Sequence, residues 1–278
     1  MSDILKAIIL SIVEGITEFL PISSTGHLIL VNQWINFEGN FGFYFNVIIQ
    51  FGAILSVVVL YLKKLNPFDK SKTQIQKQQT ISLWSKVIVG FIPAAILGFL
   101  FADIIENYLS NPIVVAVMLF IGGIFILVLE KSSKRVNIDS FDKLSYKKAF
   151  SIGIIQCLAM IPGTSRSAAT IIGAMLLGTS RQIAAEFSFF LAIPTMAGAT
   201  AYSLLKMIKS GVAITSNQWI VLLVGIIGSF IVAICVISFF MNYIKRKDFK
   251  IFGYYRIILS AIILFNYFLN AIHIFKII

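Results

Sequence analysis

The chain has 278 residues, of which 58% are apolar and 13% are charged, and its 23 Lys and Arg against 12 Asp and Glu give a formal net charge of +11. A soluble domain carries about 25% charged residues, so this composition excludes a soluble globule, a disordered chain and a coiled-coil rod. It indicates a polytopic membrane protein. The excess of positive charge is then primarily an indication of membrane topology, and we expect no nucleic-acid partner.

Six apolar segments are long enough, or nearly so, to cross the hydrocarbon core of a bilayer as helices, which takes about 20 residues. They recur from end to end of the chain. We therefore predict an all-α polytopic membrane protein that forms one membrane domain over residues 1–278. The predicted spans are Phe43–Leu62, Val87–Ala102, Ile113–Leu129, Phe187–Leu205, Trp219–Met241 and Tyr254–Ile272.

Basic residues gather in three of the connections between these spans. Lys63–Lys86, Lys131–Lys148 and Lys245–Lys250 hold six, six and four of the 23 Lys and Arg residues. With six spans, these three connections fall on one side of the membrane, and the positive-inside rule assigns that side to the cytoplasm. Both termini are then predicted to face outward.

Two shorter apolar stretches, Ile4–Leu20 and Ala149–Ile161, are each followed by a proline and a cluster of Ser and Thr residues. As a helix the second covers only about 20 Å, which is too little for a hydrocarbon core of about 30 Å. Such a stretch can enter and leave the membrane by one face where its broken backbone is buried in protein or lines a cavity. We therefore predict two re-entrant helical hairpins.

The two hairpins also indicate an internal repeat. LPISSTGHL in the first aligns with IPGTSRSAA in the second, and the alignment pairs Ser24 with Ser165. Each half, about residues 1–130 and 145–278, then holds one hairpin and three spans. Because three is odd, the halves are inverted relative to each other and the hairpins enter from opposite faces, the plan in which sites form where the repeats meet.

The first hairpin carries two acids at positions i and i+4, Glu14 and Glu18, so both carboxylates project from one face of an apolar helix. An ionised carboxylate at membrane depth costs several kcal/mol unless it is paired or solvated. One interpretation places this helix end at the aqueous interface. The other has both acids facing a polar cavity, where their hard oxygen ligands hold a divalent cation such as Mg²⁺ or Ca²⁺.

The next helix opens with a run of hydroxyl residues. Unpaired backbone N–H groups and the positive end of the helix dipole make such a helix start an anion site, although Ser and Thr there also serve as plain N-caps. Ser24 supplies a hydroxyl nucleophile, and His27 lies about one turn further along the same helix. Ser23 and Thr25 beside them are candidate phosphate-binding residues.

The second hairpin supplies Thr164, Ser165, Arg166 and Ser167 at the matching place. Arg166 is a candidate for binding phosphate oxygens, because its planar guanidinium suits them bidentately. The hydroxyls beside it are further phosphate-binding candidates. The structural alternative is an ion pair between Arg166 and an acid such as Glu186. A site that needs the acids, the histidine and this cation can exist only where the two halves meet.

At these residues the sequence resembles the bacterial undecaprenyl-diphosphatase family, also known as bacitracin-resistance proteins. The resemblance rests on EGITEFLPISSTGH at Glu14–His27 and on PGTSRSAAT at Pro162–Thr170, with EFSFFLAIP at Glu186–Pro194 also similar. Length and spacing match over essentially the whole chain. One departure is Ala168, where glycine is the commoner residue in the family, and its methyl group is expected to crowd the phosphate loop.

The resemblance implies an integral enzyme of the bacterial cytoplasmic membrane that hydrolyses undecaprenyl diphosphate to the monophosphate carrier lipid and inorganic phosphate. That activity recycles the carrier for peptidoglycan and other envelope polymers and relieves bacitracin, which sequesters the diphosphate. The resemblance also implies dependence on a divalent metal, a site open to the outer face, and a phosphate-binding role for Thr170.

We hypothesise that Ser24 attacks the terminal phosphoryl group and that His27 takes its proton, while Arg166 neutralises developing charge beside the metal at Glu14 and Glu18. In a second version His27 is itself the nucleophile. The alternative function is a transporter or lipid flippase, since inverted repeats with broken helices are common there. The expected partners are a polyprenyl diphosphate lipid and the membrane, and a homodimer is a candidate assembly.

Overall fold

The computed structural model describes residues 1–35, 37, 41–109, 111–132, 136–209 and 214–275, and the side chains at 102–103, 106–107 and 270–275 are outside the description. Within these ranges the regular structure is helical, apart from one isolated β-bridge between Ile138 and Thr179. The predicted all-α class is confirmed.

Six helices are long and apolar enough to cross a membrane, and each contains most or all of one predicted span. The largest difference is α5, which has 36 residues because its first three turns are polar and extend beyond the apolar run, and it passes through Pro93. The six are α3 (Phe41–Leu60), α5 (Gln74–Leu109), α6 (Pro112–Lys131), α9 (Arg181–Lys209), α10 (Ser216–Ile244) and α11 (Lys250–Phe275).

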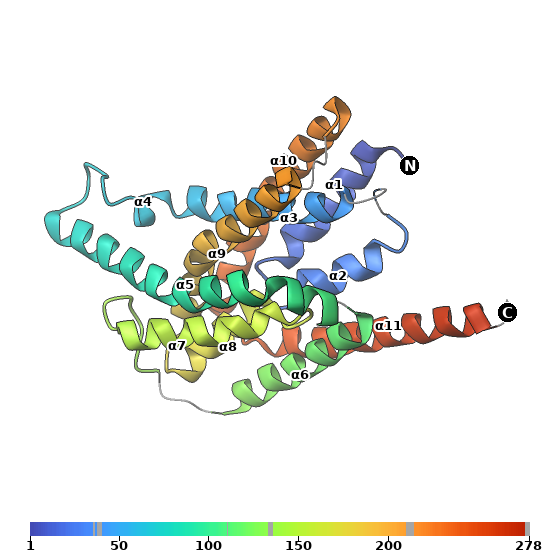
Figure 1. Cartoon of the computed structure of the whole chain (residues 1–278). Helices are drawn as coiled ribbons and strands as arrows, with labels where there is room; N and C mark the ends of the chain where they lie inside the picture. Colours follow the sequence, from blue (N-terminus) through green and yellow to red (C-terminus); the bar gives the residue numbers. More distant parts are fainter. Residues whose placement is uncertain (36, 38–40, 110, 133–135, 210–213, 276–278) are drawn as a thin grey trace.

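The remaining helices are short and lie where the two hairpins are predicted. The first pair is α1 (Asp3–Thr17) and α2 (Ser24–Val31). The second consists of α7 (Tyr146–Gln156), the 3₁₀ turn η1 (Cys157–Met160) and α8 (Arg166–Leu176). In Figure 1, α1 starts at the end of the molecule where both chain termini lie, whereas α7 starts toward the opposite end.

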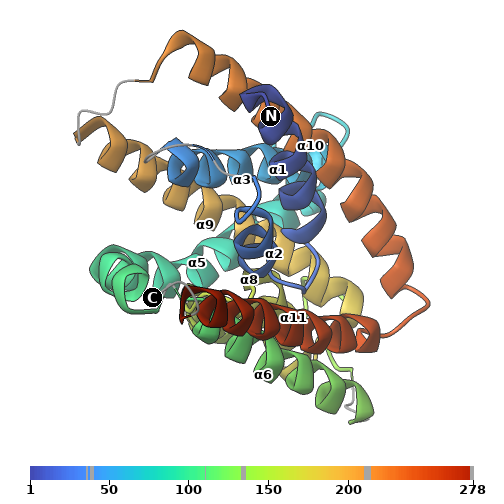
Figure 2. The ribbon, with the colours of Figure 1, turned by 90° about the vertical axis from the view of Figure 1, so that its right-hand side faces the viewer.

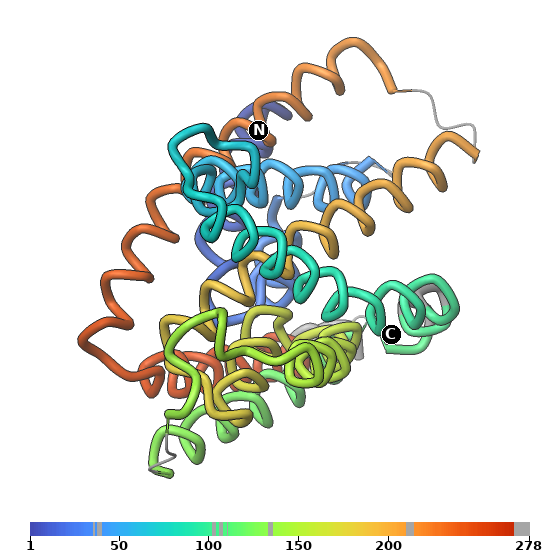
Figure 3. Tube along the Cα trace, turned by 90° about the vertical axis from the view of Figure 1, so that its left-hand side faces the viewer, coloured from blue at the N-terminus to red at the C-terminus, as the bar shows by residue number. Residues whose placement is uncertain are grey.

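A four-residue helix, α4 (Leu62–Leu65), follows α3 and lies at the end of the molecule opposite the two termini, as Figures 1 and 3 show. The basic connection Lys63–Lys86 therefore lies away from both termini. Figure 2, which looks at the opposite side of the molecule, has both termini facing the viewer. This arrangement agrees with the predicted grouping of the termini opposite the first basic connection.

Close helix contacts occur at glycines. A Cβ atom added to Gly52 on α3 would lie 2.4 Å from the Ile226 carbonyl oxygen on α10, and one added to Gly153 on α7 would lie 2.0 Å from the Gly90 carbonyl oxygen on α5. Without a side chain, the two backbones of each pair pack directly against each other. These contacts hold α10 against α3 and α7 against α5, and so position the two short helix pairs between the long helices.

Candidate active site

The turns that precede α2 and α8 end in the same backbone conformation. Ser23 and Ser165 have φ of +70° and +69°, in a region that favours glycine. Each is an N-cap whose Oγ accepts a hydrogen bond from the N–H three residues later, that of Gly26 at 3.4 Å and that of Ala168 at 3.2 Å. Capping of this kind satisfies one first-turn N–H and leaves others open.

This equivalence corrects the predicted alignment by one residue. The alignment pairs Ser24 with Ser165, but the conformations pair Ser23 with Ser165. The second turn is one residue longer between its proline and its cap, so the alignment at the prolines fails at the caps. Ser24 and Arg166, the first residues of α2 and α8, are therefore the equivalent positions.

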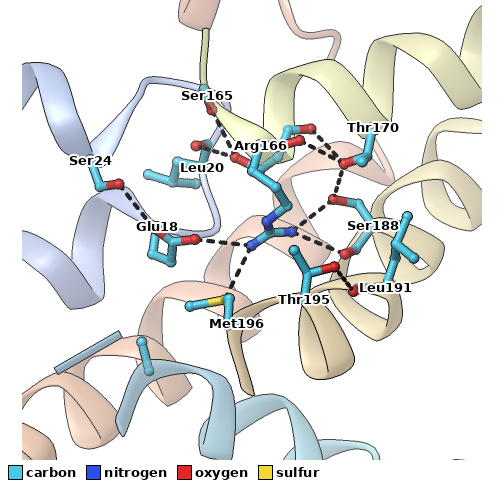
Figure 4. Close-up of polar contacts among 12 residues, drawn as sticks. Glu18, Leu20, Ser24, Ser165, Arg166, Thr170, Ser188, Leu191, Thr195 and Met196 are labelled. Carbon is cyan, nitrogen blue, oxygen red and sulfur yellow. Dashed lines mark hydrogen bonds and ion pairs between the residues drawn. The ribbon is translucent and has the colours of Figure 1, made fainter. Parts of the chain in front are cut away.

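Ser24, Glu18 and Arg166 form one hydrogen-bonded chain across the two turns (Figure 4). Ser24 Oγ donates to Glu18 Oε2 at 2.9 Å, and Arg166 Nη2 donates to Glu18 Oε1 at 3.1 Å. The side chains of Glu18 and Arg166 are only 9% and 11% exposed. The predicted meeting of an acid and a hydroxyl of the first pair with the cation of the second is present.

The rest of the Arg166 guanidinium is directed at α9. Nη1 donates to the carbonyl oxygen of Ser188 at 3.0 Å and to its Oγ at 3.2 Å, and Nη2 also contacts Met196 Sδ at 3.8 Å. Glu186 does not pair with Arg166, because its carboxylate binds Lys64 Nζ at 2.5 Å. The alternative ion pair between Arg166 and Glu186 is therefore wrong.

A cavity of about 550 Å³ opens beside this chain. Its polar wall includes six of the predicted site residues: Glu18, Ser23, Ser24, Thr25, Ser165 and Arg166. Apolar and aromatic side chains of α3, α5, η1 and α9 also line it, among them Phe43, Phe91, Phe99, Met160 and Tyr202. Polar side chains of the same walls, such as Gln50, Gln156 and Lys206, lie between them. The hydroxyl, acid and arginine end of the cavity suits an anion, and the aromatic side chains offer apolar surface to a lipid chain.

The start of each facing helix leaves backbone N–H groups beside the cavity. The first N–H groups of an α-helix have no acceptor within the helix. In the described part of the chain, those of Ser24 and Thr25 on α2, and of Arg166 and Ser167 on α8, have no acceptor from another residue either. Two helix N-termini and one guanidinium therefore face the same volume, and such groups bind phosphate.

Three of the predicted phosphate-binding hydroxyls lie outside the lining of the cavity. Ser167 Oγ donates to the Leu20 carbonyl at 2.8 Å and so joins the second turn to the first. Thr170 Oγ1 is 2.6 Å from Ser188 Oγ, behind Arg166. The Thr164 hydroxyl is buried without a partner among the described residues. In this geometry Ser167 and Thr170 support the residues that line the cavity.

Glu14 lies one turn before Glu18 on α1 and is fully buried. Neither of its carboxyl oxygens accepts a hydrogen bond from a described donor. Among the described residues no group of three His, Cys, Asp or Glu side chains could hold a metal ion.

His27 is turned toward α11 and does not contact Ser24 Oγ through a hydrogen bond. Its Nδ1 is 2.7 Å from the Ser23 carbonyl oxygen, and its Nε2 is 2.6 Å from the Tyr255 hydroxyl. The two rings are stacked, with centroids 5.5 Å apart and planes 10° apart. Of the described side chains, the one that accepts a hydrogen bond from the Ser24 hydroxyl is Glu18.

Arg256 on α11 is a site residue that the sequence analysis missed. Its side chain is fully buried, and its acceptors among the described residues are backbone carbonyls, in both turns and in α6. An arginine inside an apolar span is a recognisable signal of a functional or structural role. The acceptors, at 3.1 to 3.3 Å, are the carbonyl oxygens of Pro21, Gly163, Thr164, Met118 and Leu119.

Comparison with known proteins agrees with this site. The family model for bacitracin resistance protein BacA matches residues 7–262. Undecaprenyl-diphosphatase 1 of Clostridioides difficile (strain 630) is 54% identical over 269 residues, which cover 96% of this chain and 97% of that protein. Undecaprenyl-diphosphatase of Limosilactobacillus fermentum (strain NBRC 3956 / LMG 18251) is 53% identical over 268 residues, with 95% and 97% covered. The chain is therefore a multi-pass membrane protein of the bacitracin resistance protein BacA family.

Proposed function

We propose that this protein hydrolyses undecaprenyl diphosphate to undecaprenyl phosphate and inorganic phosphate, as its relatives' names imply for them. The observation that carries the proposal is the Ser24–Glu18–Arg166 chain at one end of a cavity that is also lined by aromatic and other apolar side chains. A hydroxyl, its proton acceptor and a cation with free helix N–H groups are what phosphoryl transfer from a lipid diphosphate requires. Activity of this kind recycles the lipid carrier and confers bacitracin resistance.

Substrate binding and activation of the hydroxyl are linked through Glu18. Arg166 Nη2 binds Glu18 Oε1 at 3.1 Å, and a diphosphate competes for the same guanidinium because phosphate oxygens form charge-assisted bonds with it. As Arg166 turns to the substrate, the Glu18 carboxylate is released from its ion pair with Arg166. Ser24, whose Oγ already donates to Glu18 Oε2 at 2.9 Å, then transfers its proton there.

In the first chemical step the Ser24 oxygen forms a bond with the terminal phosphorus while the bond to the bridging oxygen breaks, and undecaprenyl phosphate leaves with the proton that Glu18 took from Ser24. In the second step water attacks the phosphoserine and Glu18 accepts a proton of the water. Glu18 returns that proton to the Ser24 oxygen as its bond to phosphorus breaks, and inorganic phosphate leaves. Arg166 and the N–H groups of α2 and α8 stabilise the charge of the transferring group in both steps. Ser167 and Thr170 position Arg166 and the turns.

A divalent cation fits the two carboxylates of α1. The oxygens of Glu14 are buried without a described donor, and Mg²⁺ is commonly held by one or two carboxylates together with substrate phosphates and water. Glu14 and Glu18 would hold the ion, and Ca²⁺ is the other candidate. When bound, it supplies positive charge that offsets the charge of the diphosphate.

The membrane arrangement is part of the proposal. The two helix pairs are re-entrant hairpins of an inverted repeat, whose halves are about residues 1–130 and 145–278. Each helix of one half therefore has an equivalent in the other half. Helix packing supports this, because α1 packs on α10 as α7 packs on α5, while α3 packs on α9 and α6 on α11. The basic connections face the cytoplasm, and the termini and the cavity face outward. A homodimer stays a prediction that cross-linking in membranes would test.

Phosphate release from undecaprenyl diphosphate by the detergent-purified protein is the direct test. We expect release to depend on a divalent cation, and we expect an acid-stable phosphoserine at Ser24 to accumulate when the reaction is quenched early. A phosphohistidine would instead support the version in which His27 attacks. The transporter alternative needs no nucleophile, so it predicts transport of lipid with no release of phosphate, in wild-type protein and in Ser24→Ala.

A further inference from the structure

Tyr255 is an α11 residue that the proposed reaction does not use. Its hydroxyl lies 2.6 Å from His27 Nε2, and its ring stacks on the imidazole with the planes 10° apart. Arg256, the next residue along α11, donates to the Pro21 carbonyl at 3.3 Å. Two successive residues of α11 therefore bind the first turn on either side of the Ser23 cap: Arg256 binds Pro21 before it, and Tyr255 binds His27 after it.

The hydrogen bonds of His27 define the tautomer of its ring. A carbonyl oxygen can only accept, so the 2.7 Å contact with the Ser23 carbonyl requires a proton on Nδ1. In the neutral imidazole Nε2 is then an acceptor, and the Tyr255 hydroxyl is its donor. With both ring nitrogens occupied, the imidazole has no free nitrogen for the Ser24 hydroxyl, which donates to Glu18.

What His27 holds is the strained part of the turn. Ser23 has φ of +70°, a conformation that costs about 1–3 kcal/mol and persists only where the surroundings over-determine it. Its carbonyl belongs to the peptide that joins it to Ser24. Because a peptide unit is planar, a hydrogen bond that fixes the Ser23 carbonyl also fixes the direction of the Ser24 N–H beside the cavity.

We infer that Tyr255 is a positioning residue for the proposed reaction: by donating to Nε2 it keeps His27 in the Nδ1-protonated tautomer, and His27 then holds the Ser23–Ser24 peptide. This inference rests on the proposed function, and it assigns His27 a positioning role in place of the proton transfer expected from the sequence. Tyr255 acts through His27 and the peptide and does not touch the reacting atoms.

Nuclear magnetic resonance of the purified protein labelled with ¹⁵N histidine tests the tautomer directly, because the chain has only two histidines. His273→Gln leaves the His27 signals alone in the spectrum. We expect an Nδ1-protonated ring in the wild-type background and a shifted Nε2 signal in Tyr255→Phe, which keeps the ring and loses the donor. Tyr254→Phe, at the exposed neighbour on α11, is the matched control and leaves the signals unchanged.

Kinetics separate a positioning role from proton transfer. We expect Tyr255→Phe to lower kcat about 10-fold, which corresponds to about 1.4 kcal/mol, with KM within twofold. His27→Asn keeps an N–H near the position of Nδ1, so it should retain at least 10 times the activity of His27→Ala and still form the phosphoserine. A size-exclusion profile and a thermal melt check that each variant is folded.

Three results would overturn the inference: an Nε2-protonated ring in wild type, His27 signals that Tyr255→Phe does not change, or His27→Asn as inactive as His27→Ala. Failure of the proposed function is seen separately, as absence of phosphate release from the wild-type protein. The tautomer measurement does not depend on activity, so the two failures are distinguishable.

Discussion

Arg166 and Glu18 are 148 residues apart in the chain, and their side chains form a buried ion pair of 3.1 Å. Arg166 serves two partners at once, since one nitrogen binds Glu18 and the other binds Ser188. The planar fork of arginine allows this, whereas the single ammonium of lysine does not.

We therefore predict that Arg166→Lys lowers kcat/KM by about 10²–10³-fold, and that Arg166→Ala is no better. Phosphate release measured over a range of lipid concentrations gives the values. Lys143→Ala is the control, because Lys143 pairs with Asp139 and both side chains are more than half exposed, where an ion pair contributes little. Arg166→Lys with activity within twofold of wild type would contradict the bidentate role.

The positive φ of Ser165 predicts a difference between two small substitutions. Ser165→Ala loses the cap and keeps the strain, so we expect a loss of about 1 kcal/mol or more in unfolding free energy. Ser165→Gly loses the cap but relieves about 1 kcal/mol of strain, so its unfolding free energy stays near that of wild type. Thermal melts of the detergent-solubilised proteins measure both.

Ser145 is the matched control for this comparison. It is also an N-cap, at the start of α7, but its φ is −77°. Both its Gly and its Ala variants lose the capping hydroxyl, and the difference between them contains no relief of a positive φ. The difference at Ser165 should therefore be larger by about 1 kcal/mol. Equal differences at the two sites would mean that the Ser165 backbone is unstrained.

The position of Arg256 predicts the effect of a substitution at Gly122, which is far from it in the sequence. A Cβ added to Gly122 on α6 would clash with the Arg256 guanidinium, because the two would be much closer than atoms normally approach. Gly122→Ala should therefore displace Arg256 from the turn carbonyls, and leaving those acceptors buried without a donor costs about 1–3 kcal/mol each. We expect a lower melting temperature and loss of activity, as in Arg256→Gln.

Gly198→Ala is the control for stability, because the nearest atom to its added Cβ is 3.6 Å away, at Phe91. Its melting temperature should stay within about 1 °C of the wild-type value, a shift of about 0.6 kcal/mol for a chain of this size. If Gly122→Ala melts as Gly198→Ala does, the close approach of α6 to Arg256 is not needed for folding.

Removal of divalent cations should abolish phosphate release, and added Mg²⁺ should restore it. We predict that Glu14→Gln raises the Mn²⁺ concentration needed for half-saturation at least 10-fold, as measured by electron paramagnetic resonance of the bound ion without substrate. The reason is that Glu14 supplies one of only two carboxylates. Asp139→Asn, at an exposed acid, should bind as wild type. Unchanged Mn²⁺ binding in Glu14→Gln would place the cation elsewhere.

Topology is testable by labelling single cysteines with a membrane-impermeant maleimide. In a background with Cys157→Ala and Cys235→Ala, we expect Ser2→Cys to react in intact cells and Ser71→Cys to react only after the membrane is opened. Ser71 lies in the basic connection before α5, which the positive-inside rule assigns to the cytoplasm. The reverse pattern would invert the proposed orientation.

The long helices could be predicted because a membrane span has a local sequence signal, a run of about 20 consecutive apolar residues. The meeting of the acidic and the cationic turn could be predicted, since unpaired charges at membrane depth must find partners. The ion pair itself was not predicted, because the acid named for Arg166 was Glu186. The orientation of His27 could not be predicted, because its spacing from Ser24 is equally compatible with either ring direction. One of the two groups that hold the ring is Tyr255, which lies 228 residues away in the chain.

The one-residue difference between the two turns could not be predicted for a related reason. The prolines are equivalent by residue type, whereas the caps are equivalent by backbone conformation, which the sequence does not show. Arg256 was visible as a charge in an apolar span, yet its acceptors are main-chain carbonyls and carry no residue-type signal. A buried cation without an acidic partner in sequence is a reason to search for turns whose carbonyls need a donor.

The hydrogen bond from Arg256 to the Pro21 carbonyl joins residues 235 positions apart. During synthesis the first turn therefore waits for nearly the whole chain to be made before its donor exists. A ribosome-bound or C-terminally shortened chain that ends before α11 would carry every residue that lines the cavity and still lack the hydrogen bonds from Arg256 to the two turns. Enzymatic competence should thus arrive late and abruptly, when the last helix inserts.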